Sequence, residues 1–154
     1  RSPSRGLGDV YKRQGFVGQV DETNPMILES LITEGYLPVI SPVAADEDGV
    51  GYNVNADLVA AAIAGALRAD AAIFLTDVDG IYRNWPDKST LIDEISVDDL
   101  KKISSTFTDG MIPKVTAAIS AIDLGATSVR IANGTDLSCV LDALDNRGGT
   151  LVSA

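Results

Sequence analysis

Short apolar segments alternate with longer helix-forming segments along this chain, and this order constrains its fold most strongly. Residues 71–75 (AAIFL) form a continuous apolar run, which is typical of a central strand in a parallel sheet. Residues 128–132 predict another strand, with helices predicted before it at 113–124 and after it at 137–144. Because strands joined through helices form right-handed crossovers, the sequence predicts an α/β fold, a three-layer αβα sandwich with a mostly parallel sheet.

The remaining elements follow from caps and turn residues. Asn24 is placed to cap a helix at residues 25–34. Ser96, with an acidic residue three positions later, resembles a capping box that opens a helix ending at residue 103. Further predictions are strands at 16–20, 37–43 and 150–153, an alanine-rich helix at 56–68, a polar turn at 45–49 and a loop at 83–89.

The first residues of the chain differ in character from the rest. Residues 4–14 (SRGLGDVYKRQ) resemble the in-frame translation of a sequencing-library adapter. We therefore predict that residues 1–14 are a non-native segment and exclude them from the fold prediction. Residues 15–154 are expected to form one domain or part of a larger one, with ample apolar content for a core.

The composition excludes several functional classes. A formal net charge of −10 argues against general binding to nucleic acid or to anionic membranes. The apolar run at 58–67 is too short to span a bilayer, so we interpret it as a buried helix in a cytoplasmic protein. Histidine is absent, and the single cysteine, Cys139, lies in an apolar stretch that predicts an inert core residue. Disulfide scaffolds, zinc clusters and histidine-based triads are thereby excluded.

The first segment that could carry chemistry is residues 52–57 (YNVNAD), at the start of a predicted helix. Capping explains part of it, since Asn55 can satisfy free amides and Asp57 complements the positive end of the helix dipole. One cap needs only one asparagine, however. Asn53 is therefore a candidate for binding a substrate carboxylate or amide, and Asp57 for orienting nearby ammonium groups.

The second segment, residues 75–82 (LTDVDGIY), follows the predicted central strand. In α/β sheets, ligands bind beyond the carboxyl ends of the strands. The Asp-x-Asp-Gly pattern is similar to a calcium loop, but the twelfth position counted from Asp77 is Lys88 instead of glutamate, which excludes an EF-hand. A plain β-turn and a loop that cradles a nucleotide both remain compatible with this pattern.

The third segment, residues 108–114 (TDGMIPK), leads into the helix predicted to start at Pro113. Lys114 then lies in the first turn, where it adds positive charge to the positive end of the helix dipole. A bound phosphate would compensate that charge, and the free amides of the helix terminus point to the same region. An exposed, solvated lysine is the simpler alternative.

Together, these segments resemble the amino-acid kinase family, which implies a carbamate-kinase-like fold. The resemblance also includes residues 16–20 (FVGQV) and 35–40 (GYLPVI), and it covers essentially all of residues 15–154. On this resemblance, residues 15–50 are the end of a substrate-side portion and residues 51–154 are the C-terminal, ATP-binding portion. The Asn-x-Asn-Ala-Asp element distinguishes best among members of this family, and it resembles the corresponding segment of kinases that act on N-acetyl-L-glutamate.

The resemblance implies transfer of the γ-phosphoryl group of ATP, with Mg²⁺, to the side-chain carboxylate of N-acetyl-L-glutamate in arginine biosynthesis. A carboxylate has a reference pKa of about 4.3 and arrives ionised, so no general base is required. Lys114 and Asp57 would be catalytic, Asn53 and Asn55 would bind the substrate, and no protein side chains would form a metal site. The implied ATP-binding residues are Asp77, Val78, Asp79, Gly80, Ile81, Tyr82, Thr108 and Lys114.

The family also uses a Lys-Gly-Gly segment, a glycine cluster and an arginine that would lie upstream of Gly15 and are not in this sequence. We therefore expect no useful kinase activity from this chain alone, and a homo-oligomer for the full-length form. Two alternatives stay open. One is an aminoadipate-type kinase of lysine biosynthesis, and the other is a nucleotide-binding or oligomerisation module without chemistry of its own.

Overall fold

A four-stranded sheet with the order β3-β5-β6-β4 lies at the centre of the structure, a computed structural model that describes residues 20, 23–107 and 110–154. The strands are β3 (Ala72–Thr76), β4 (Glu94–Ser96), β5 (Ser128–Asn133) and β6 (Thr150–Ser153). β3 pairs with β5 and β4 pairs with β6 in parallel, whereas β5 and β6 are antiparallel. The sheet is therefore mixed, with parallel pairs in the majority.

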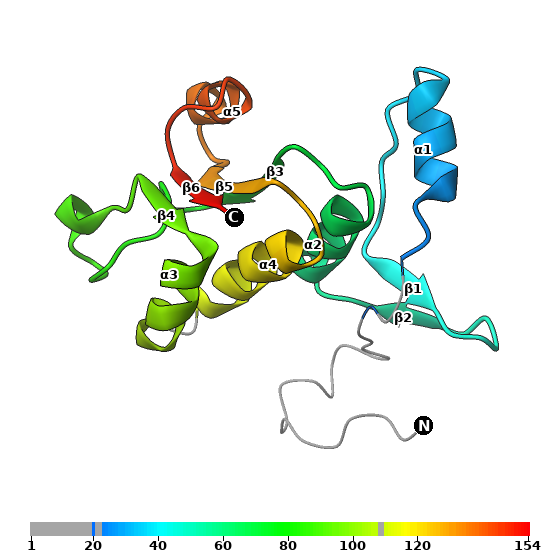
Figure 1. Ribbon diagram of the computed structural model, residues 1–154, viewed down its shortest axis with the longest axis horizontal. Coiled ribbons are helices and arrows are strands. Elements are labelled where there is room, and N and C mark those ends of the chain that lie inside the picture. Colours follow the sequence, from blue (N-terminus) through cyan, green and yellow to red (C-terminus); the bar gives the residue numbers. More distant parts are fainter. Residues whose placement is uncertain (1–19, 21–22, 108–109) are drawn as a thin grey trace.

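Helices cover both faces of this sheet, as predicted. α2 (Ala56–Ala66), α3 (Val97–Ile103) and α4 (Ile112–Asp123) lie on one face, and α5 (Leu137–Leu144) lies on the other (Figure 1). The core is formed mainly between the sheet and the first of these helix layers, where Val115, Val129, Ile131 and Val152 are almost completely buried. The three-layer α/β/α architecture is thus confirmed.

The helices α2 and α4 run side by side in the same direction. Near their C-terminal ends, a Cβ atom added to Gly65 would lie 2.3 Å from the Cβ atom of Leu124, so the two backbones approach closely there. Small buried residues make this approach possible, namely Ala61 and Ala64 on α2 and Ala117, Ala118 and Ala121 on α4. Because the two helices are parallel, their N-termini lie together, beside the carboxyl ends of β3 and β5.

The strand β3 is paired on one side within the described residues, by β5. The prediction that residues 71–75 form a central strand is therefore wrong for this sheet, because β3 lies at its edge and Leu75 is about half exposed. The central position next to β3 belongs to β5, whose Val129 and Ile131 are fully buried. The apolar run indicated burial correctly for Phe74 but could not indicate which neighbouring strands are present.

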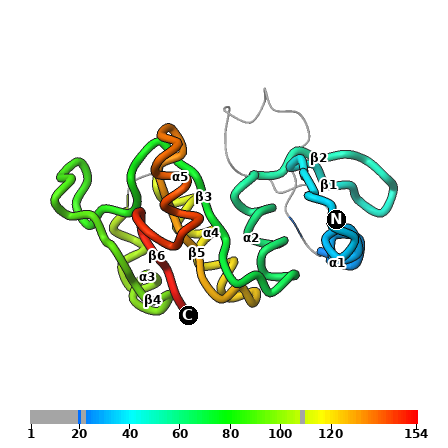
Figure 2. The backbone as a smooth tube through the Cα atoms, turned by 90° about the horizontal axis from the view of Figure 1, so that it is seen from above, coloured from blue at the N-terminus to red at the C-terminus, as the bar shows by residue number. Residues whose placement is uncertain are grey.

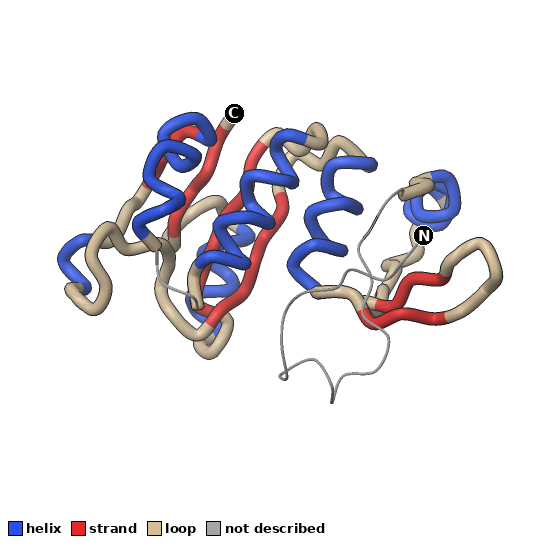
Figure 3. Tube along the Cα trace, turned by 90° about the horizontal axis from the view of Figure 1, so that it is seen from below, coloured by secondary structure: helices blue, strands red, loops and turns tan. Residues whose placement is uncertain are grey.

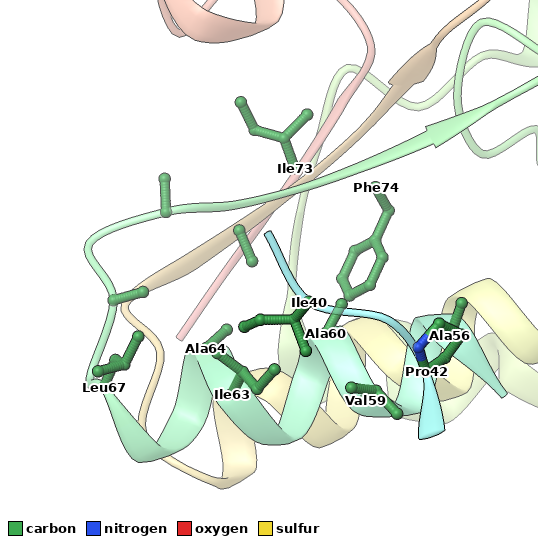
Figure 4. Close-up of a pocket in the computed structure, with 13 residues that line it drawn as sticks. Ile40, Pro42, Ala56, Val59, Ala60, Ile63, Ala64, Leu67, Ile73 and Phe74 are labelled. Atoms are coloured by element: carbon green, nitrogen blue, oxygen red, sulfur yellow. The ribbon is translucent and has the colours of Figure 1, made fainter. Parts of the chain in front are cut away.

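An apolar groove of about 390 Å³ lies along this open side, between β3, α2 and the segment around Ile40. In Figure 4, Ile40 and Pro42 lie over the face of α2 that carries Val59 and Ile63. The prediction of a buried helix at 58–67 is correct for only one face of α2. That face packs on α4, whereas Val59 and Ile63 on the other side line the groove.

An antiparallel hairpin replaces one of the predicted strands. It consists of β1 (Val43–Ala45) and β2 (Gly51–Asn53), joined by the predicted polar turn. The turn is held by Asp46, whose carboxylate accepts hydrogen bonds from the Val50 amide at 2.8 Å and from the Tyr52 hydroxyl at 2.9 Å. The predicted strand at 37–43 is wrong up to residue 42: in the part of the chain that the structure describes, residues 37–42 belong to no strand, and Pro38 and Pro42 have no amide hydrogen to donate.

The helix α1 (Met26–Thr33) confirms the prediction at 25–34, with Asn24 accepting a hydrogen bond from the Met26 amide. Together with the hairpin, α1 lies at one end of the molecule, on the far side of α2 from the sheet (Figures 2 and 3). No residue of α1 is buried. The predicted strand at 16–20 lies outside the described residues except for residue 20, which is in no strand.

From α3 to the end of the chain, the described helices and strands follow the sequence prediction closely. The bounds of α5 and β6 are those predicted, and Ser96 caps α3 by accepting a hydrogen bond from the Asp99 amide. Two short 3₁₀ turns, η2 (Lys88–Thr90) and η3 (Ser104–Thr106), complete the described elements. Cys139 is only partly buried on α5, so its predicted place in the core is wrong. Within the described ranges, none of the helices has the length and apolar character that crossing a membrane requires.

Candidate active site

The N-termini of α2 and α4 lie close together, beside the carboxyl ends of β3 and β5. Asn55 caps α2, since its Oδ1 accepts hydrogen bonds from the amides of Asp57 at 2.9 Å and Leu58 at 3.2 Å. The capping role expected for Asn55 is therefore confirmed. At α4, Met111 occupies the capping position and offers no side-chain hydrogen bond. Within α4 the first-turn amides of Ile112 and Lys114 have no helical partner and can donate to an anionic ligand, whereas Pro113 has no amide hydrogen.

Lys114 and Asp57 form an ion pair between these two N-termini. The distance from Lys114 Nζ to Asp57 Oδ2 is 3.3 Å, and the side chains are 20% and 24% exposed. Asp57 lies in the first turn of α2 and Lys114 in the first turn of α4, so the parallel packing of the helices brings together two residues 57 positions apart. The carboxylate compensates the lysine in part and holds its ammonium group at the mouth of the site.

Asn53 lies at the end of β2, directly before the turn into α2. It is exposed, and in the hairpin register it lies opposite Val43. The hairpin therefore delivers Asn53 to the same end of α2 as Asn55 and Asp57. The structure records no hydrogen bond between the Asn53 side chain and another described residue, and this residue is exposed.

A cavity of about 220 Å³ lies beside the start of α4, at the carboxyl end of β3. It is lined by Thr76, Asp77, Val78, Tyr82, Trp85, Gly110 and Met111. Three of the residues predicted to bind ATP, Asp77, Val78 and Tyr82, are thus brought to one cavity. Trp85 and Met111 line it as well, although the sequence prediction did not include them. The only signal for Trp85 in the sequence was an aromatic residue within the predicted loop at 83–89.

Gly80 and Ile81 were predicted at the same site, but they lie beneath the loop surface. The Ile81 amide donates a hydrogen bond to Thr150 Oγ1 at 2.8 Å, and Thr150 in turn donates to the carbonyl of Ile92 at 2.6 Å. A Cβ atom on Gly80 would lie 2.5 Å from Thr150 Oγ1, so this position requires glycine. Both residues fasten the loop to β6, and neither is among the described lining residues of the cavity.

Asp79 is the polar centre of this loop. Its Oδ1 accepts a hydrogen bond from Asn133 Nδ2 at 3.0 Å, and its Oδ2 accepts one from the Tyr82 hydroxyl at 2.9 Å. The amide of Asn133, followed by the hydroxyl of Tyr82, holds the pKa of the Asp79 carboxyl below its ordinary value of 3.8. Burial and the neighbouring Asp79 carboxylate raise the pKa of Tyr82. Asp79 is therefore ionised at neutral pH and bonded on both oxygens.

Asn133 was not predicted as a site residue. It is the last residue of β5 and lies next to Thr76, the last residue of β3, in the register of the sheet. A polar residue directly after a strand was a signal in the sequence, but its partner became evident only from the pairing of β3 with β5. Thr108, another residue predicted to bind ATP, lies outside the described residues. No group of three or more metal-ligating side chains forms among the residues that are described.

Comparisons with known proteins agree with this geometry. Residues 3–133 match the amino acid kinase family. The matched range includes part of residues 1–14, whose non-native origin stays a prediction. Acetylglutamate kinase of Desulforamulus reducens is 44% identical over 142 residues, covering 90% of this chain and 50% of that protein. For acetylglutamate kinase of Mycobacterium sp. (strain KMS), the identity is 40% over 136 residues, or 88% of this chain and 47% of that protein.

Solved structures show the same fold. N-acetylglutamate synthase from Neisseria gonorrhoeae, complexed with coenzyme A and N-acetyl-glutamate, superimposes with a TM-score of 0.81 at 25% identity, over 90% of this chain and 32% of that chain. Carbamate kinase from Giardia lamblia bound to AMP-PNP gives a TM-score of 0.68 at 25% identity, over 83% of this chain and 43% of that chain. This chain spans about half the length of the curated relatives it matches. With its fold, its paired helix N-termini and these matches, the chain belongs to the amino acid kinase family.

Proposed function

We propose that this chain is the ATP-binding portion of a kinase that phosphorylates the side-chain carboxylate of N-acetyl-L-glutamate in arginine biosynthesis. The observation that carries the proposal is the Lys114–Asp57 ion pair between the N-termini of α4 and α2. An ammonium group and free helix amides at one point are suited to the phosphates of a nucleotide. The relatives named acetylglutamate kinase support the choice of reaction.

Lys114 would contact the oxygens of the transferred phosphoryl group and offset the charge that spreads over them during transfer. Asp57 would act on Lys114, since its carboxylate already holds the ammonium group at 3.3 Å. The cavity at the end of β3 would receive the rest of the nucleotide, with Asp77, Val78 and Tyr82 in its wall. The carbamate kinase bound to AMP-PNP has a similar fold, which supports a nucleotide in this region.

Mg²⁺ would arrive with the phosphates of ATP, where it offsets repulsion between the nucleotide and this acidic chain. The acceptor would be the substrate carboxylate, which is ionised at neutral pH, so the protein needs to position it in line with the γ-phosphoryl group. Asn53 would bind the substrate with its exposed amide. Asn55 uses its Oδ1 for capping, which leaves its Nδ2 as a donor to the substrate.

We further propose that the chain of 154 residues has no useful turnover by itself, that the full-length form is a homo-oligomer, and that it is cytoplasmic. The alternative from another functional class is a nucleotide-binding or oligomerisation module without chemistry of its own. The other alternative, an aminoadipate-type kinase, differs from the preferred function in the acceptor that it phosphorylates, so an assay with both acceptors distinguishes the two.

The test is trapping of the acyl phosphate product with hydroxylamine, for this chain and for a version extended at its N-terminus to the relatives' length. We expect turnover of N-acetyl-L-glutamate by the extended form only. Lys114→Ala and Asp57→Ala in that form should each lower turnover by about 100-fold, because Lys114 offsets the charge that develops on the phosphoryl oxygens and Asp57 holds its ammonium group in place. Lys102→Ala is the control, since Lys102 is an exposed lysine paired with Asp99.

Unchanged turnover in both variants would contradict the assignment of the site. Turnover of 2-aminoadipate derivatives in place of N-acetyl-L-glutamate would favour the lysine-pathway alternative. Nucleotide binding by the extended form without turnover of either acceptor would favour the non-catalytic module.

A further inference from the structure

Asn133 connects the central strand of the sheet to the wall of the 220 Å³ cavity. Its Nδ2 donates to Asp79 Oδ1 at 3.0 Å, and the other oxygen of Asp79 accepts from the Tyr82 hydroxyl at 2.9 Å. Asn133 is only partly exposed and sits at the end of β5, the best buried strand of the sheet. Its donor is therefore anchored to a buried strand, whereas Asp79 and Tyr82 lie in a loop.

The hydrogen bonds from Asn133 through Asp79 end at Tyr82, whose ring packs against that of Trp85 in the wall of the cavity. Tyr82 is 5% exposed and meets Trp85 edge to face, with ring centroids 5.2 Å apart and an interplanar angle of 61°. Both rings line the cavity, and Trp85 is 49% exposed there. Aromatic rings with a free face are suited to stacking on a nucleobase. Met111, at the N-terminus of α4, also lines the cavity, so the cavity lies beside the first turn that carries Lys114.

We propose that Asn133 is a positioning residue for nucleotide binding: by holding Asp79, it fixes Tyr82 and Trp85 in the orientation that receives the base. This inference rests on the proposed function, in that it assumes a nucleotide in the cavity. It goes beyond that function because it assigns a role to a residue on β5 that does not line the cavity.

The side chain of Asn133 allows its two functions to be separated. Its Oδ1 accepts hydrogen bonds from the Thr135 amide at 2.9 Å and from Thr135 Oγ1 at 2.6 Å, which closes the turn after β5. Asn133→Asp keeps an acceptor for both bonds, removes the donor to Asp79 and places a second carboxylate against it. The exchange Asn133→Asp with Asp79→Asn restores one donor and one acceptor in reversed order, and Tyr82 can still donate to the oxygen of an amide at position 79.

The experiment measures two properties of wild-type protein, Asn133→Asp and the double exchange variant. The first is the fluorescence emission of Trp85 without ligand, which is unambiguous because the chain contains a single tryptophan. The second is the affinity for Mg²⁺-ADP by calorimetry. Asn24→Asp is the matched control, since it makes the same chemical change at an exposed helix cap where aspartate serves equally well. Thermal unfolding of each variant reports on the fold.

We expect Asn133→Asp to shift the Trp85 emission to longer wavelength and to weaken ADP binding on the order of tenfold, the usual scale for one hydrogen bond to a charged group. The double exchange should recover both properties, and Asn24→Asp should change neither. If Asn133→Asp does not fold, Asn133→Ser replaces it, because serine can still accept from Thr135 but is too short to reach Asp79.

Unchanged emission and affinity in Asn133→Asp would overturn the inference while leaving the proposed function intact. Loss of both without recovery in the double exchange would also overturn it, since Asn133 would then be merely structural. If wild-type protein binds no ADP, the proposed nucleotide site fails and the role of Asn133 in binding fails with it. The emission measurement would then still show whether Asn133 orients Trp85.

Discussion

Asp79 illustrates how the surroundings of one residue determine what it can do. Its sequence context, Asp-x-Asp-Gly, is compatible with a metal ligand or a turn, yet both carboxylate oxygens are engaged by Asn133 and Tyr82. These bonds favour the ionised form and lower the pKa of the carboxyl. Asp79 was predicted to bind ATP, and its bonded oxygens instead favour a part in holding the loop.

The first prediction concerns the pKa of Asp79. Because the pKa in the folded protein is below the ordinary value of 3.8, the stabilisation from these bonds is present above about pH 3.8 and is lost as the pH falls through the folded pKa. Asn133→Ala removes the largest cause of the lowering, so the pKa of Asp79 should rise toward 3.8 while the bond from Tyr82 keeps part of the effect.

Carboxyl chemical shifts followed by NMR as a function of pH measure this change. Asp87 is an internal control, because its pKa is lowered by hydrogen bonds from Ser89, and Asn133 is not among the causes. An Asp79 pKa that is the same in wild type and in Asn133→Ala would show that Asn133 does not hold the carboxylate.

At the same scale, the sequence predicted residues whose role depends on local geometry. Asn55 caps the helix that follows it, and Lys114 occupies the first turn that its position after Pro113 required. Asn133 and Trp85 were missed for different reasons. The partner of Asn133 is 54 positions away and is brought near by strand register, and the exposure of Trp85 depends on how its loop folds over the sheet edge.

Among the elements, the parallel pair α2 and α4 determines where the site can form. The Lys114–Asp57 ion pair at the N-terminal ends of the two helices and the Gly65–Leu124 contact near their C-terminal ends fix how the helices lie against each other. The sequence predicted both helices and the alanine-rich composition of α2. The sequence could not predict that the two helices contact each other. The spacing of apolar residues shows which face of a helix is buried, but it does not show which element packs on that face.

The second prediction is that Gly65→Ala destabilises the protein. In an exposed helix the change would be favourable by about 1 kcal/mol, because alanine has the higher helix propensity. Here the added Cβ atom would lie 2.3 Å from the Cβ atom of Leu124 and 3.1 Å from its carbonyl oxygen. Overpacking of this kind costs about 1–3 kcal/mol, so the free energy of unfolding measured with urea should fall.

Ala60→Gly, at an exposed position of the same helix, provides the comparison. It should lower stability by about 1 kcal/mol through propensity alone. A Gly65→Ala variant that is as stable as wild type would show that α2 and α4 are less closely packed than described.

Strands were harder to predict than helices, for a physical reason. A strand forms only where a neighbouring strand pairs with it. In the described part of the chain, residues 37–42 belong to no strand although Val39 and Ile40 are β-branched, and the three-residue strands of the hairpin form around Asp46. The same reason explains why β3 was expected at the centre of the sheet and was found at its edge.

Across the whole molecule, the polar and apolar features lie at different places. The candidate phosphate and nucleotide residues gather where α2, α4, β3 and β5 meet at one edge. The groove of about 390 Å³ follows the open side of β3 and α2 and is lined mainly by alanine and aliphatic side chains. The fold class and the layers were predictable from the alternation of elements, whereas the position of β3 at the end of the strand order was not.

We propose that Lys114 and the N-terminus of α4 bind the phosphates of a nucleotide, with Asp57 holding the ammonium group of Lys114 in place. The most direct measurement is calorimetric binding of Mg²⁺-AMP-PNP and of adenosine to wild-type protein, Lys114→Met and the control Lys102→Met. We predict that Lys114→Met weakens AMP-PNP binding by about 10- to 100-fold, as expected for one bond to a charged group, and leaves adenosine binding unchanged. Equal AMP-PNP affinity in wild type and Lys114→Met, or no AMP-PNP binding by wild type, would contradict the claim.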